Sequence, residues 1–150
     1  MKFTDGYWSI REGNQAYYPV HVHEVEIQED ALVVYGPTKR LNHRGDTLNL
    51  PVLSVRFSSP MENVIRVQLY HHKGGRPRKP QFELNPQPLP QVNITDEKQA
   101  ATLTSGSLSV RVEKAGDWRI DFLDGGRGIT GSGRNGMGFV DTPEGRFIHE

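Results

Sequence analysis

The sequence contains no cysteine among its 150 residues. Disulfide bonds, thiolate catalysis and cysteine-ligated zinc are therefore excluded. It also lacks any apolar stretch near the ~20 residues that a membrane-spanning helix needs, and its first residues lack the apolar core of a secretory signal. We therefore expect a cytoplasmic protein with no membrane partner, and we assign no role to the Asn93-Ile94-Thr95 glycosylation sequon.

The sequence also has no excess of positive or negative charge. Lys plus Arg and Asp plus Glu each number 18, so the formal net charge is zero. A neutral chain has no global field to attract nucleic acid, and we expect no nucleic-acid partner. The one basic run, residues 73–79, lies among glycines and prolines, which favours a solvated loop over a phosphate site.

Amphipathic-helix periodicity is absent, whereas alternation with a period of two recurs along the chain. No helix longer than a turn is expected, because no 12-residue window has apolar residues at helical spacing. Alternation is typical of antiparallel strands with one face on a core. It is clearest in residues 53–58, 65–70, 108–113 and 118–122. With about nine or ten strands expected, we predict an all-β fold, an antiparallel β-sandwich of two packed sheets.

Turn residues separate these predicted strands. Residues 28–31 divide a predicted hairpin, and Gly116 can supply the positive φ that another short loop needs. The alternation in residues 20–27 changes phase partway along. A β-bulge near His23 and Glu24 would return both halves to the same face.

Two segments carry little strand signal. Residues 73–91 include five prolines, so we expect an extended surface loop. Residues 125–138 contain seven glycines and few apolar residues, and we expect this segment to be mobile or to depend on neighbours for order. It resembles a phosphate loop only superficially, because the Gly-Lys-Ser/Thr ending and a following helix are missing.

Candidate metal-binding and catalytic residues are few. His21 and His23 share one face of a predicted strand, but a metal site needs three or four converging ligands. We therefore predict adventitious nickel or zinc there at most, no native metal and no cofactor. Asp117, Asp121 and Asp124 follow one strand and its turn, with Asp121 on the solvent face. Glycosidase chemistry needs two carboxylates in a cleft, so we predict no catalytic residue among them.

Three aromatic residues are candidates for contact with a sugar. Tyr7, Trp8 and Tyr18 would each present a flat ring if exposed on the sandwich, and such rings can stack on sugar faces. Trp8 has two other interpretations, a plug at the core or sheet edge and a contact with another domain. The sequence leaves all three open.

Segments spread along nearly the whole chain resemble, in order and spacing, the opening of the family 31 α-xylosidases. They are residues 1–10, 22–26, 33–35, 53–60 and 64–67, and the similarity is strongest in residues 105–112, 118–123 and 129–132. The pattern departs from the family in the turn at residues 43–46 and in the loop at residues 73–90. No substrate contact is carried over to those two regions.

The resemblance implies a galactose-mutarotase-like β-sandwich over residues 1–150, one that precedes a catalytic (β/α)8 barrel. The family domain runs longer than 150 residues, so we expect this one to be truncated. The family's catalytic aspartates lie in the barrel, and no residue of this chain matches them. The parent reaction implied is retaining hydrolysis of terminal α-xylosyl linkages.

The function implied for the chain itself is that of a non-catalytic N-terminal scaffold. Such a domain packs on the barrel and helps to wall the substrate entrance. Its expected partners are the barrel, further copies of the chain in a homo-oligomer, and a xylose-containing oligosaccharide through the parent. The alternative is a stand-alone carbohydrate-binding module.

Overall fold

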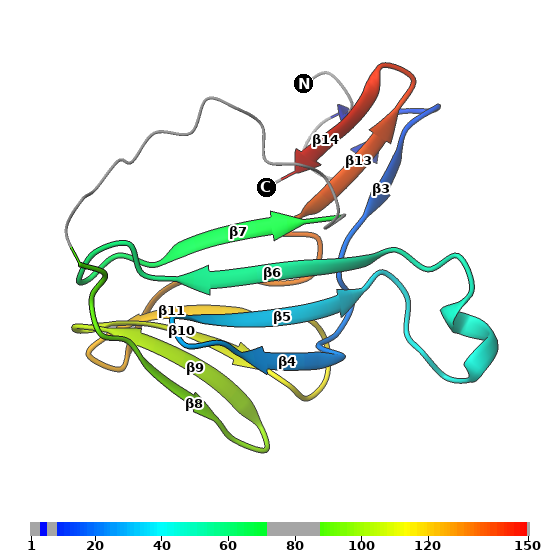
Figure 1. Cartoon of the computed structure of the whole chain (residues 1–150). Coiled ribbons are helices and arrows are strands. Elements are labelled where there is room, and N and C mark those ends of the chain that lie inside the picture. The colour runs from blue at the N-terminus through cyan, green and yellow to red at the C-terminus, as the bar shows by residue number, and fades with distance from the viewer. Residues whose placement is uncertain (1–3, 6–8, 72–87, 150) are drawn as a thin grey trace.

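The computed structural model describes residues 4–5, 9–71 and 88–149 (Figure 1). Fourteen strands lie within these ranges, more than the nine or ten expected, and the surplus includes several short strands. The shortest are β1 (Thr4–Asp5), β2 (Ser9–Ile10) and β3 (Gln15–Tyr17). The only helical element in the described ranges is the 3-10 turn η1 (Arg44–Thr47), so no helix there could cross a membrane.

Two antiparallel sheets form the body of the fold. The first has the order β4-β5-β6-β7 and the second the order β12-β11-β10-β9-β8. The strands of the first are β4 (Glu24–Ile27), β5 (Ala31–Pro37), β6 (Val52–Ser58) and β7 (Arg66–Tyr70). Those of the second are β8 (Asn93–Asp96), β9 (Ala100–Ser105), β10 (Leu108–Glu113), β11 (Ile120–Asp124) and β12 (Arg127–Ser132).

A third sheet stands at one end of this body (Figure 1). It has the order β14-β13-β3, with β13 (Gly138–Thr142) at its centre and β14 (Gly145–His149) at one edge. The first two sheets lie one over the other in Figure 1. The predicted all-β sandwich is therefore confirmed.

The core fills the space between the first two sheets. Alternate residues of β5, β6, β9, β10 and β11 point inward, as period-two patterning requires. Burying each such side chain contributes about 1.5–3 kcal/mol. Eight of them are fully buried, namely Leu32, Val34, Val55 and Phe57 from the first sheet, and Leu103, Val110, Val112 and Ile120 from the second.

Strand β7 follows the predicted alternation but is only partly covered. Val67 pairs with Phe57 and so points to the core side, yet 38% of Val67 is exposed. Val67 is only partly covered because β7 is the outer strand of its sheet.

Trp118 closes one end of the core. It precedes β11, is 2% exposed, and its backbone N–H donates to the Val20 carbonyl at 2.9 Å. The ring lies so close to β5 that a Cβ atom at Gly36 would be 2.8 Å from Trp118 Cζ3 and 2.5 Å from Pro19 Cβ. Glycine at position 36 therefore allows β5 to pack closely against both Pro19 and the Trp118 ring.

The two predicted turns are confirmed. The Gln28 N–H donates to the Ala31 carbonyl at 2.8 Å, which closes the β4–β5 hairpin. Gly116 has a φ of 81° in the β10–β11 connection. The predicted loop at residues 73–91 falls mostly outside the described residues.

The predicted β-bulge before β4 is also present. Glu24 is the pairing partner of Tyr35, and the His23 N–H donates to the Tyr35 carbonyl at 2.9 Å. Two residues of one strand thus oppose one residue of the other, which is the defining feature of a bulge. As a result Val22 and Val25 both pack against the core.

Strand β12 was not predicted from the glycine-rich segment at residues 125–138. It pairs with β11 along the edge of the second sheet, after a turn in which Gly125 and Gly126 have φ values of 53° and 85°. Residues 127–131 are exposed, so backbone pairing rather than burial orders the strand. A strand held in this way leaves no alternating pattern in the sequence.

Replacing Gly36 by alanine should lower the free energy of unfolding by about 1–3 kcal/mol, the usual cost of overpacking. The added Cβ would overlap Pro19 and the Trp118 ring. Urea denaturation measures the effect. Gly128→Ala is the matched control, because a Cβ there meets no atom within 4 Å. Equal stabilities of the two variants would contradict the packing role of Gly36.

Candidate functional site

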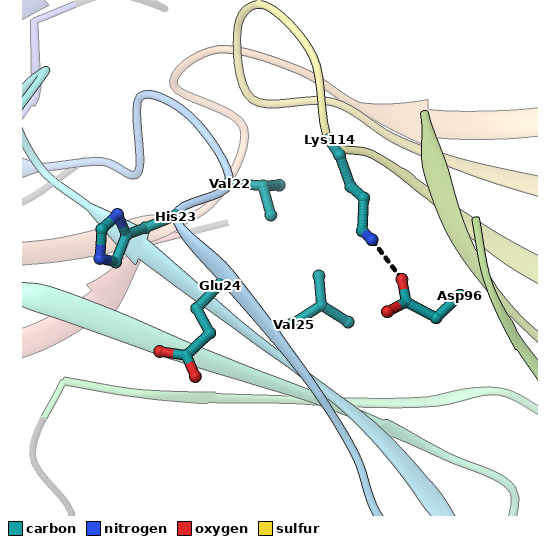
Figure 2. Close-up of a pocket in the computed structure, with 6 residues that line it drawn as sticks. All are labelled: Val22, His23, Glu24, Val25, Asp96 and Lys114. Atoms are coloured by element: carbon teal, nitrogen blue, oxygen red, sulfur yellow. Dashed lines mark ion pairs between the residues drawn. The ribbon is translucent and has the colours of Figure 1, made fainter. Parts of the chain in front are cut away.

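A cavity of about 250 Å³ opens at the side of the sandwich, between β4 and β8 (Figure 2). Figure 2 shows Val22 and Val25 pointing toward Lys114 and Asp96, with His23 and Glu24 pointing the other way. The bulge before β4 explains this division, since it turns both valines to the core side. These six residues line the cavity and combine an apolar floor with a charged rim.

Lys114 links the end of β10 to the β8–β9 turn at the rim of this cavity. Its ammonium forms an ion pair with Asp96, and Nζ donates to the Glu97 carbonyl at 2.9 Å. Its backbone N–H donates to the Gln99 carbonyl at 2.8 Å. Lys114, the residue that follows β10, thus holds the β8–β9 turn in place. Its positive charge is balanced by the Asp96 carboxylate.

A second cavity, of about 570 Å³, lies along the same side of the fold. Its lining comes from the β4–β5 turn and from the segment that leads into β8. These residues are Glu29, Asp30, Leu89, Pro90, Gln91 and Val92. Asp30 is held by the Arg56 guanidinium, whose Nη2 donates to both carboxylate oxygens at 3.0 and 3.1 Å.

His21 and His23 lie near each other, but not on a strand as predicted, because β4 begins only at Glu24. Their ring centroids are 6.5 Å apart with an interplanar angle of 86°. Burial, followed by the nearby charges of Arg40 and His23, holds the pKa of His21 below its usual value. No group of three or more His, Asp or Glu side chains suited to a metal ion occurs in the described part of the chain. The absence of a native metal site stays a prediction.

Tyr18 is the one candidate sugar-stacking residue within the described ranges; Tyr7 and Trp8 lie outside them. The Tyr18 ring is partly buried and meets the His149 ring edge-to-face, with centroids 5.6 Å apart. Its hydroxyl lies 3.4 Å from His149 Nδ1, and burial raises the pKa of the Tyr18 phenol. A role for these three residues in sugar binding stays a prediction.

An aromatic cluster surrounds Phe139 in the third sheet, and no pattern in the sequence predicts it. Tyr17 of β3 stacks on the Phe139 ring with centroids 4.7 Å apart, and the Arg146 guanidinium of β14 lies 4.6 Å from the same centroid. Because β13 is the central strand, the two partners reach Phe139 from both sides. Phe139 is 1% exposed, so the cluster packs the sheet and offers no open stacking platform.

Arg146 also binds a carboxylate of the same sheet. Its Nη2 donates to Asp141 Oδ2 at 2.7 Å. This bond holds the pKa of Asp141 below its usual value and raises the pKa of Arg146. No periodic signal identifies these residues, because Asp141 and Arg146 lie five apart across a tight hairpin.

The aspartates considered for glycosidase chemistry lie at the surface. Asp117 forms an ion pair with Arg40, and Asp121 accepts hydrogen bonds from Arg119 Nε at 2.9 and 3.2 Å. Such carboxylates are solvated and paired with arginine. The solvent-face interpretation of Asp121 therefore holds.

The chain is similar to two curated α-xylosidases, whereas no protein-family model matches it. Alpha-xylosidase XylQ of Lactiplantibacillus pentosus is 34% identical over 132 residues, which cover 88% of this chain and 17% of the relative. An alpha-xylosidase of Emericella nidulans is 34% identical over 148 residues, which cover 93% of this chain and 19% of the relative. The chain spans less than a fifth of these relatives, and the resemblance to α-xylosidases seen in the sequence is confirmed.

Folding stability should fall as the pH drops below about 6.5, the ordinary pKa of histidine. The pKa of His21 is lower in the folded protein, so below about 6.5 the unfolded chain binds more protons and unfolding becomes easier. Thermal unfolding at about pH 7.5 and about pH 5.5 measures this dependence. His21→Gln should weaken it. An unchanged dependence in that variant would contradict the assignment to His21.

Proposed function

We propose that this chain is the N-terminal, non-catalytic scaffold domain of an α-xylosidase-like glycoside hydrolase of family 31. The similarity to two α-xylosidases carries the proposal, because it extends over about nine tenths of this chain but less than a fifth of each relative. Most of such an enzyme would therefore lie outside these 150 residues. In this proposal the protein is cytoplasmic.

The chemistry in this proposal belongs to a (β/α)8 barrel outside the chain. Retaining hydrolysis of a terminal α-xylosyl linkage needs a nucleophile and an acid/base about 5–5.5 Å apart. The ion pairs of Asp117 and Asp121 with surface arginines support a structural role for these carboxylates. The barrel supplies the reacting groups and the pocket for a xylose-containing oligosaccharide.

The chain contributes a rigid, galactose-mutarotase-like sandwich to that enzyme. Its two sheets pack through fully buried apolar side chains, and the ion pair between Lys114 and Asp96 fixes the β8–β9 turn. A scaffold of this kind packs on the barrel, helps to wall the substrate entrance, and offers further surface for association between copies of the enzyme.

Assays with an aryl α-xyloside test the proposal. The full-length enzyme should release the aryl group, and the purified 150-residue chain should give no release above that of buffer. Turnover by the chain alone would contradict the non-catalytic role. An inactive full-length protein would contradict the parent activity.

Calorimetry separates the scaffold from the stand-alone carbohydrate-binding module. Titration of the chain with millimolar xyloglucan oligosaccharides should give no binding heat if it is only a scaffold. Binding that disappears in Trp8→Ala would instead support a sugar-binding module with an aromatic platform. The variant Leu48→Ala, at an exposed loop position, serves as the control.

A further inference from the structure

Within the described residues, the sandwich is open along one side, between β4 and β8. Each is the outermost described strand of its sheet, so each presents an edge on that side. The smaller cavity joins Glu24 and Val25, at the start of β4, to Asp96 at the end of β8. The larger one joins Glu29, just past β4, to the segment that leads into β8. The two cavities thus mark the ends of one line, which we call the β4–β8 seam.

The floor of the seam is apolar and incompletely covered. Val22 and Val25 on one side, and Val92 and Ile94 on the other, are partly buried and pack against the core. Ile27 of β4 is 50% exposed and Leu89 is 61% exposed. A row of core-facing apolar side chains that stays partly in contact with water favours a surface that another element covers.

The charges along the seam are unbalanced at its two ends. Lys114 is paired with Asp96, and Asp30 is paired with Arg56. Glu24 and Glu29, one in the lining of each cavity, have no ion pair within the described ranges. Glu24 begins β4, and Glu29 lies in the turn that follows the end of this strand at Ile27. A ligand that fits is therefore extended and carries positive charge toward each end.

We propose that the β4–β8 seam binds an extended, strand-forming segment of the parent enzyme from outside this chain, with apolar residues over the valine floor and basic residues opposite Glu24 and Glu29. The inference rests on the proposed function, since the relatives are more than five times longer than the part that the chain matches. Addition of a strand to a free sheet edge is a common mode of recognition. The described lining of the two cavities includes no Phe, Tyr or Trp, which disfavours a sugar as the occupant.

Cysteine accessibility tests the inference, because the chain has no cysteine of its own. Ile27→Cys places a thiol on the seam, and Leu48→Cys places one on a loop residue that is 76% exposed. Alkylation of each variant is followed by peptide mass spectrometry in the 150-residue chain and in the full-length enzyme. We expect the rate for Ile27→Cys to fall at least about tenfold in the full-length enzyme, with Leu48→Cys within about twofold.

Charge reversal in the full-length enzyme adds a second readout. Glu29→Lys should raise the alkylation rate of Ile27→Cys by weakening the docked segment, whereas Glu62→Lys, at an exposed position that lines neither cavity, should leave it unchanged.

Hydrolysis of an aryl α-xyloside by the same preparations separates the two ideas. An active enzyme with an unprotected Ile27→Cys thiol would overturn the seam inference and leave the proposed function standing. Equal protection of Ile27→Cys and Leu48→Cys would also overturn it. Protection that grows with the concentration of the 150-residue chain alone would assign the seam to a second copy and overturn the proposed occupant.

Discussion

The packing of two apolar sheet faces is the constraint on which the rest of this structure depends. Fully buried aliphatic side chains of β5, β6, β9 and β10 meet between the sheets, and Trp118 closes one end against Gly36. The bulge at His23 exists because both Val22 and Val25 must reach this core. The cavities lie at the side where β4 and β8 are the outermost strands that the structure describes.

The sequence predicts the parts of the fold in which burial on one face controls the residue pattern. Period-two alternation identifies β6, β10 and β11, and its phase change locates the bulge at His23. Strand β12 escapes prediction because both of its faces are exposed and only pairing with β11 orders it. The Phe139 cluster and the seam also escape, since they join residues that are distant in sequence.

In the proposed function, the reacting groups lie outside this chain. Lys114, Arg40 and Arg146 each bind a carboxylate, and these ion pairs fix turns and strands. These ion pairs support the scaffold role that we propose, and the partly exposed apolar floor supports the contact that we propose for the β4–β8 seam. Similarity to part of two α-xylosidases is the observation on which the proposed parent enzyme rests.

The size of the native gene product tests the central claim most directly. An antibody raised against this chain, used to probe an immunoblot of source-cell extract, should detect a band several times larger than the 16.9 kDa of the chain. That result would place the sandwich within a larger enzyme. A single band at the chain's own size would contradict the account and leave a stand-alone domain.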